Sequence, residues 1–231
     1  MIVASQPEVF YPSSDGEPLA ETSLHIDAII AVVTALRLYL QQRQQAESAI
    51  VLTNQFLYYA QGWPRLRVAP DVMVIFGVAP GPRDNFKIWE EGQVPAVIFE
   101  ITSAATQDQD QGFKKGLYQQ LGVQEYWQFD PKGEWIAEKL RGYQLAHGEY
   151  VPIPDCCSQI LQLRLSVEAQ LLSFYRLDTD EKLPILEDMA LALQQAVSQA
   201  EAEQQRAEQE RLRAERLAEK LRELGFNPDQ I

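Results

Sequence analysis

The sequence is short of cysteine, and this shortage limits what the chain can hold. Among its 231 residues there are two cysteines, Cys156 and Cys157, and they are adjacent. Neighbouring cysteines seldom pair with each other, and two ligands cannot complete a zinc site of the usual four-ligand kind. We therefore expect two half-buried thiols in a reducing cytoplasm, without a redox role.

Long apolar runs and basic charge are also scarce. No run of eighteen or more apolar residues occurs, so no membrane span is expected, and residues 1–18 lack the pattern of a secretory signal. Asp and Glu number 33 against 20 Lys and Arg, which gives a net charge of −13. Such a chain does not attract nucleic acid over its whole surface, so nucleic-acid binding would need a locally basic groove. The acidic excess suits a protein that collects divalent cations.

Proline and internal glycine are absent from residues 187–224, which are rich in Ala, Glu, Gln, Arg and Leu. These are strong helix formers, and Gly225 and Pro228 end the pattern. At ~1.5 Å per residue the helix would be on the order of 55–60 Å long, too long to lie on a small domain. We therefore predict two parts, a domain over 1–186 and a long charged helix within 187–231.

A seven-residue register runs along this helix, apolar except for two glutamates and filled with alanine in its middle. Its positions are Leu186, Met189, Leu193, Ala196, Ala200, Glu203, Ala207, Glu210, Ala214, Leu217, Leu221 and Leu224. Because alanine buries little surface, pairing should be weak at the centre and firmer at the leucine end. The helix is either a coiled coil that joins two copies or recruits a partner, or a solvated single helix with Glu–Arg pairs. The seam favours self-association as a homodimer.

Residues 1–186 alternate between helical and strand patterns. Helices are predicted over 23–43, behind a Thr/Ser cap, and over 107–122, ended by Gly122. Strands are predicted over 48–60, 67–77, 95–103 and 123–131, with one or two hairpins over 134–153. We therefore expect an α/β fold with a mixed central sheet flanked by helices, in which the step from 95–103 to 124–129 is a right-handed parallel crossover.

Two carboxylates stand in otherwise apolar strands. Asp71 follows Pro70 near the start of one strand, and Glu100 comes late in another. If these strands are antiparallel neighbours, the two acids converge at one edge of the sheet, where they repel unless a cation lies between them or one stays protonated. Oxygen ligands suit Mg²⁺ or Mn²⁺, and the carbonyl of Ile101 would add a third oxygen. A metal held in this way can activate water for attack at phosphorus.

A positive partner is expected from the following helix, in which Asp110, Lys114 and Tyr118 are spaced by four and share one face. Lys114 is the first candidate and Lys115 the second. Taken singly, each acid is more often a turn residue or an ion-pair partner, and each lysine a solvated charge. The ordered set of the three groups is more specific than any one of them.

The whole pattern, PD…EITS…DxxxKxxxYxxLGVxEYW, resembles the PD-(D/E)XK nuclease superfamily and, more closely, the Uma-type restriction endonuclease family. The similarity runs from about Ser13 to about Arg176 and includes "PDVMVIFG", "VIFEITSAAT" and "LGVQEYWQFDP". It implies a restriction-endonuclease-like fold and Mg²⁺-dependent (or Mn²⁺-dependent) cleavage of phosphodiester bonds in DNA. By this resemblance Asp71 and Glu100 are metal ligands and Lys114 is the catalytic lysine.

One departure from the superfamily pattern matters. The usual lysine lies two residues after the glutamate, where this chain has Thr102. Either Lys114 supplies the ammonium group, or the site is degenerate and the protein is a binding or scaffold module that acts through its coiled coil. The family's early acidic residue corresponds to Glu21, or less well to Glu17, and would complete the metal shell.

Further residues are candidates for contact with nucleic acid. His25 could touch a phosphate or the metal, although a capping or half-buried histidine is the alternative. Arg65 and Arg67, with Arg83 and Lys87 nearby, flank the first acidic strand and could hold a phosphate backbone. Their alternative is a solvated edge strand. The aromatic residues Tyr118, Tyr126 and Trp127 are expected in the core rather than stacked on bases.

Overall fold

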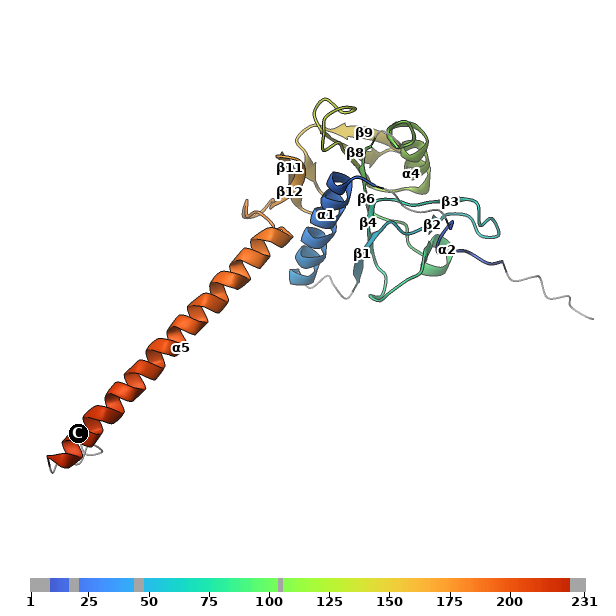
Figure 1. The fold of residues 1–231 in the computed structure, drawn as a ribbon. Coiled ribbons are helices and arrows are strands. Elements are labelled where there is room, and N and C mark those ends of the chain that lie inside the picture. The colour runs from blue at the N-terminus through green and yellow to red at the C-terminus, as the bar shows by residue number, and fades with distance from the viewer. Residues whose placement is uncertain (1–8, 17–20, 44–47, 104–105, 225–231) are drawn as a thin grey trace, which may run out of the picture. The chain divides into compact units, whose positions relative to one another are not determined.

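The structure is a computed structural model that describes residues 9–16, 21–43, 48–103 and 106–224. The chain divides into two compact units, Met1–Ile185 and Leu186–Ile231. The first unit is a mixed α/β domain and the second is a single long helix (Figure 1).

The first unit is built on a six-stranded mixed sheet with the order β1-β4-β6-β7-β8-β9. These strands are Ala49–Thr53, Val72–Phe76, Val97–Ile101, Glu125–Phe129, Leu140–Ala146 and Glu149–Ile153. Only β6 and β7 are parallel neighbours within it, and the chain passes between them through helical residues, whereas the other pairs are antiparallel. The expected α/β class, the mixed sheet and the parallel crossover connection are therefore confirmed.

Two of the predicted strands are each divided between two sheets. The 48–60 pattern forms β1 and β2 (Leu57–Tyr58), and the 67–77 pattern forms β3 (Arg67–Val68) and β4. Asn54 causes the first break, because its φ of 49° is left-handed and its N–H lies 3.2 Å from the carbonyl oxygen of Pro70. The short strands assemble as β3-β2-β5, with β5 at Phe86–Lys87 and α2 at Ile88–Glu91.

A third sheet, not anticipated by the sequence patterns, follows the β8–β9 hairpin. It has the order β10-β11-β12, at Cys157–Ser158, Leu163–Glu168 and Leu171–Arg176. Cys156 and Cys157 are free thiols of intermediate exposure, as expected. Burial raises the pKa of both thiols, and so keeps them protonated near neutral pH.

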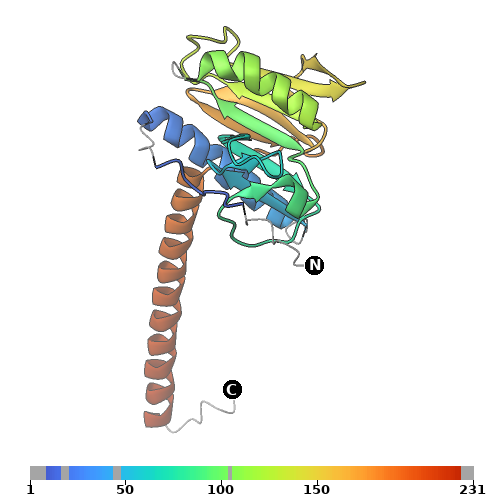
Figure 2. The same ribbon diagram turned by 90° about the vertical axis from the view of Figure 1, so that its right-hand side faces the viewer.

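Side chains that alternate along β4 and β6 enter two separate cores. Val74 and Phe99 pack in one core with helix α1 (Ser23–Gln42) and strands β11 and β12. Met73 and Ile98 pack in the other with Tyr118 of helix α4 (Lys115–Leu121). Figure 1 shows β11 and β12 on one side of β6 and α4 on the other, and in Figure 2 the orange strands lie behind the green strands. This alternation decides which groups of the candidate site face each other.

Helix α1 is long and apolar enough to cross a membrane by length and composition alone. Of the most apolar 18-residue stretch of this helix, 56% is buried inside the domain, and residues such as Val32 and Leu36 are fully enclosed in the core. The core helices of water-soluble domains pass the same test. The packing of α1 therefore favours a core helix.

A buried carboxylate joins the third sheet to the central one. Glu125 of β7 is 2% exposed and accepts hydrogen bonds from Ser158 Oγ at 2.5 Å and from the N–H of Ile160 at 3.0 Å. Trp127 Nε1 donates to the same carboxylate at 3.2 Å. Removing the acid would leave these donors buried without an acceptor.

We therefore expect Glu125→Ala to lower the free energy of unfolding by about 2–4 kcal/mol, because buried donors lose a charged acceptor. The measurement is urea denaturation followed by circular dichroism. Glu138→Ala is the matched control, since that side chain is 67% exposed and pairs with Arg141 only at the surface. Equal losses in the two variants would contradict the role assigned to Glu125.

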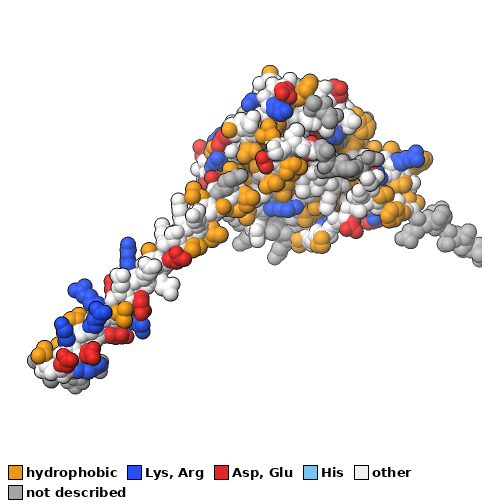
Figure 3. Space-filling model, viewed as in Figure 1, with side chains coloured by type: hydrophobic (Ala, Val, Ile, Leu, Met, Phe, Trp, Pro, Cys, Tyr) orange, Lys and Arg blue, Asp and Glu red, His pale blue; other side chains and the backbone are white. Residues whose placement is uncertain are grey.

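The second unit, as far as the structure describes it, is helix α5, Leu186–Glu223. Figure 3 shows its charged side chains gathered over the C-terminal half, whereas the first half is mostly polar and apolar. Arg211 lies 2.8 Å from Glu208 and 3.7 Å from Glu215, as expected for pairs along one helix. Leu193 and Leu217 of the seven-residue seam are exposed. Pairing of this seam with a second chain remains a prediction.

Candidate active site

Asp71 and Glu100 lie at the same edge of the sheet, as predicted for antiparallel neighbouring strands. In the register of β4 and β6, Val72 lies opposite Phe99, so the next pair outward is Asp71 and Glu100. Asp71 Oδ2 accepts a hydrogen bond of 2.6 Å from the backbone N–H of Ile101. Ile101 therefore touches the site through its amide, while its carbonyl remains a predicted metal ligand. Glu100 is only 1% exposed, whereas the Asp71 side chain keeps 15% of its surface open.

Lys114 supplies the expected positive charge. Its Nζ lies 2.9 Å from Glu100 Oε2 and 2.9 Å from Asp110 Oδ1, and Tyr118 donates a hydrogen bond of 2.6 Å to Glu100 Oε1. The four-residue spacing thus brings Lys114 and Tyr118 to Glu100, and Asp110 to Lys114. Lys115, the second candidate, instead has its Nζ 3.7 Å from the ring centroid of Tyr143.

The helix that carries these groups is not uniform. Gln107–Gln109 is α-helical (α3), Asp110–Lys114 forms one π-helical turn (η1), and α4 follows. The carbonyl oxygen of Asp110 accepts from Gln128 Nε2 at 2.8 Å and from Tyr126 OH at 2.9 Å, so strand β7 holds this turn in place. Tyr126 is fully buried, as predicted for a core residue. Single π-helical turns are often found at functional sites.

Burial controls the charges of the site. It is the main cause that raises the pKa of Glu100 to about 8, although the Lys114 ammonium opposes the shift. The negative charges of Asp71 and Asp110 raise this pKa further. Burial also raises the pKa of Asp110 and by itself would lower that of Lys114, but the two acids outweigh it and keep the ammonium charged. The carboxyl groups of Glu100 and Asp110 thus share one ammonium group.

His25 and Glu21 extend the site from the first turn of α1. His25 Nε2 lies 3.6 Å from Asp71 Oδ1, and its Nδ1 lies 3.8 Å from Glu21 Oε2. The helix cap is Thr22, whose Oγ1 accepts from the N–H of His25 at 3.3 Å, so His25 itself is not the cap. Burial lowers the pKa of His25, but the carboxylates of Asp71 and Glu21 more than offset it, and the pKa is raised. Glu17, the weaker candidate, lies outside the described residues.

A divalent metal fits the donors of this site, although the ligands are not arranged as a finished metal centre. Within residues 9–16, 21–43, 48–103 and 106–224, no group of three or more His, Cys, Asp or Glu has metal-holding geometry. The donor chemistry is nevertheless that of Mg²⁺ or Mn²⁺, with carboxylate oxygens and a surplus of negative charge. A carboxylate offers about four lone-pair sites, so Glu100 can bind a cation while it keeps its bonds to Lys114 and Tyr118.

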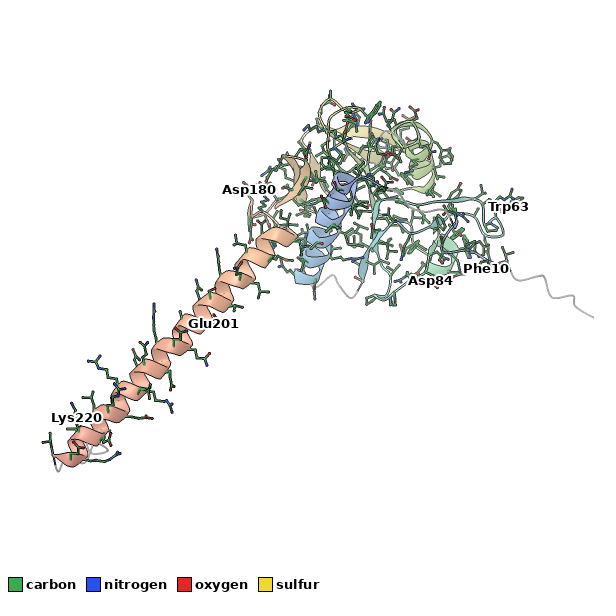
Figure 4. The ribbon with its side chains drawn as sticks, viewed as in Figure 1. Phe10, Trp63, Asp84, Asp180, Glu201 and Lys220 are labelled. Atoms are coloured by element: carbon green, nitrogen blue, oxygen red, sulfur yellow. The ribbon has the colours of Figure 1, made fainter. Side chains whose placement is uncertain are left out.

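The arginines predicted to hold a phosphate backbone lie on the small sheet. Arg65 is exposed in the turn between β2 and β3, near Trp63, whose position at the outer end of this hairpin is marked in Figure 4. The Arg67 guanidinium lies 4.1 Å from the Phe56 ring centroid. Arg83 and Lys87 are paired with Glu91 and Glu90. The local positive field is therefore smaller than expected, because acids offset two of its four charges.

Sequence reasoning missed a loop beside the site. Asp130 is 1% exposed and accepts four backbone N–H groups, from Lys132, Gly133, Trp135 and Ile136, at 2.6–3.1 Å. The signal that could have revealed it is an Asp-Pro pair directly after a buried strand, since Asp commonly organises the turn that follows it. This loop and the first turn of α1 enclose a pocket of about 400 Å³.

Comparisons with known proteins identify the family of the chain. The family named Uma2, described as "Putative restriction endonuclease", matches residues 4–175, and the chain belongs to this family. No curated protein gives a significant match. Among solved structures, the chain is similar to a "putative nuclease belonging to DUF820" from Anabaena variabilis ATCC 29413. That match has 16% identity, a TM-score of 0.44, and coverage of 74% of this chain and 82% of the other.

Proposed function

We propose that the protein is a divalent-metal-dependent nuclease that hydrolyses phosphodiester bonds in DNA. The observation that carries the proposal is the meeting of Asp71, Glu100 and Lys114, with the Lys114 ammonium 2.9 Å from Glu100. Carboxylates beside a buried ammonium suit chemistry in which negative charge develops on a phosphate. Membership of the restriction endonuclease family supports the same reaction class.

In this proposal Asp71, Glu100 and Glu21 would hold Mg²⁺ or Mn²⁺, with the Ile101 carbonyl as a further oxygen ligand. Such an ion, when bound, lowers the pKa of water and offsets charge on the phosphate. Tyr118 orients Glu100 through its hydrogen bond of 2.6 Å.

The Lys114 ammonium donates a hydrogen bond to a phosphate oxygen as negative charge develops on that oxygen, and Asp110 holds the ammonium in position. Thr102 at the superfamily's lysine position has no charge, which leaves this role to Lys114. His25, beside Asp71, would contact the phosphate, and Arg65 and Arg67 would contact the DNA backbone farther away.

Cleavage of DNA with Mg²⁺ or Mn²⁺ present tests the proposal. Asp71→Asn keeps the shape of the side chain but removes a ligand charge, so we expect a loss of about 10³-fold or more in rate. Asp84→Asn is the control, since Asp84 lies on the surface (Figure 4). Unchanged cleavage in Asp71→Asn would overturn the proposal. Absence of both cleavage and Asp71-dependent Mn²⁺ uptake would favour the degenerate scaffold.

We also propose that α5 joins two copies as a coiled coil. The support is the seven-residue seam, of which Leu217 is 54% exposed within the single chain. Removal of residues 187–231 should convert a dimer to a monomer in sedimentation equilibrium. Leu217→Lys should weaken the dimer about tenfold or more, because a charge then enters the seam. Leu212→Lys, off the seam on the same helix, is the matched control, and a truncated chain that stays dimeric would refute the model of pairing.

A further inference from the structure

A pocket of about 400 Å³ adjoins the candidate active site, and most of its lining has no part in the chemistry proposed above. It lies at the carboxyl ends of the parallel strands β6 and β7, where Thr102 and Ser103 follow one strand and residues 130–135 follow the other. In open α/β sheets ligands bind at such carboxyl ends. The volume lies within the range of about 300–1,000 Å³ that is common for small-ligand sites.

The pocket shares part of its wall with the candidate active site. His25 and Ile101 line the pocket, and the same two residues contact Asp71, at 3.6 Å through Nε2 and at 2.6 Å through the backbone N–H. Glu21, a predicted metal ligand, also lines it. A substrate whose phosphate lies at Asp71 would therefore have an adjoining nucleoside at the mouth of this pocket.

The wall suits a flat heterocycle with a polar edge. Trp135, which keeps 41% of its surface exposed, provides an aromatic face, and Leu24 and Pro131 add apolar surface. Three buried polar residues also line the pocket: Asp130, which is 1% exposed, and Thr102 and His25, which are each 4% exposed. Thr102 Oγ1 and His25 Nδ1 have no hydrogen-bond partner among the residues that the structure describes. Buried polar atoms of this kind ordinarily have a partner, so they point to a ligand.

The charges at the pocket argue against a bare phosphate as its occupant. Glu21 and Glu134 both line it, with Lys132 as its one lysine among the lining residues. The backbone that carries Trp135 is held in place, because Asp130 Oδ2 accepts the backbone N–H of Trp135 at 2.6 Å. A rigid aromatic surface costs little entropy to use in binding.

We propose that this pocket holds one unpaired nucleobase of the substrate, stacked on Trp135, and that the enzyme therefore prefers single-stranded or unpaired DNA to a fully paired duplex. The inference rests on the proposed nuclease function, whose substrate class it names. In a duplex the base would have to leave its stack before it could enter, at a cost in binding energy.

The test compares the binding of a labelled single-stranded oligonucleotide of mixed sequence with that of its blunt duplex, in EDTA and at fixed salt, so that no cleavage occurs. Wild-type protein should bind the single strand about tenfold more tightly, as loss or gain of one stacked base implies. Trp135→Ala should lose this preference by weakening single-strand binding alone, and Trp135→Phe should retain it.

Trp63→Ala is the matched control, since Trp63 is 68% exposed at the β2–β3 turn and should leave the preference intact. A preference that is absent in wild type, or that survives in Trp135→Ala, overturns the inference. If wild type with Mg²⁺ cleaves duplex and single strand equally, the inference fails while the nuclease stands. If nothing is cleaved but binding still prefers single strands through Trp135, the hydrolysis proposal fails while the pocket assignment stands.

Discussion

Replacing Lys114 with methionine is expected to slow metal-dependent cleavage of DNA by about 10²–10³-fold, the usual cost of removing one preorganised donor from a transition state. Lys114 is 9% exposed, and Glu100 and Asp110 each hold its ammonium at 2.9 Å. Methionine keeps the length of the side chain but has no charge and no N–H. The measurement is the single-turnover cleavage rate with Mg²⁺ at saturating protein.

Lys115→Met is the control for this experiment, because Lys115 is next in the chain but lies over the ring of Tyr143. Its rate should stay within about threefold of wild type, as for a change away from the reacting atoms. Circular dichroism should show that Lys114→Met is folded. Equal rates in Lys114→Met and wild type would show that the Lys114 ammonium has no part in catalysis. Lys114 would then not replace the lysine that the superfamily has at the position of Thr102.

The sequence allowed the centre of this site to be predicted because two regular patterns specify it. Strand alternation and the position of Pro70 placed Asp71 at the start of one strand and Glu100 late in another, and antiparallel pairing then brings them together. Helical spacing placed Lys114 and Tyr118 on one face. Both rules depend on local geometry, and the π-helical turn at Asp110–Lys114 left the four-residue spacing intact.

The surroundings of the site could not be predicted because they depend on tertiary contacts. The strand pattern around Asn54 runs on through residues 48–60 and does not show that the chain changes sheets there, and Arg67 lies in the small sheet because β3 pairs with β2. The approach of His25 to Asp71 joins residues far apart in the chain. The binding of four backbone N–H groups by Asp130 needs the whole loop to be folded. Propensity and periodicity carry no information on such contacts.

The metal-free protein is expected to lose stability as the pH rises from about 5 to 8. The pKa of Glu100 is raised from 4.5 to about 8 in the folded state, mainly by burial, so the native protein binds this proton more tightly than the unfolded chain. Stability falls with pH wherever the native state binds more protons. The raised pKa of His25 acts in the same direction, since its contribution is lost as pH rises through the folded pKa. We expect a loss of about 3–4 kcal/mol in the free energy of unfolding.

Urea denaturation in EDTA at several pH values measures this loss, and Glu100→Gln separates Glu100 from the other titrating groups. The amide cannot ionise, so the variant should lose most of the pH dependence and should be at least as stable as wild type at pH 8. Mg²⁺ should stabilise wild type at pH 8 and leave Glu100→Gln almost unchanged, because a ligand that binds only the folded state adds its binding energy to stability. An equal slope in the two proteins would mean that Glu100 ionises normally. If Glu100 destabilises the metal-free protein at pH 8 and stabilises the metal-bound protein, its carboxylate serves cation binding and not folding.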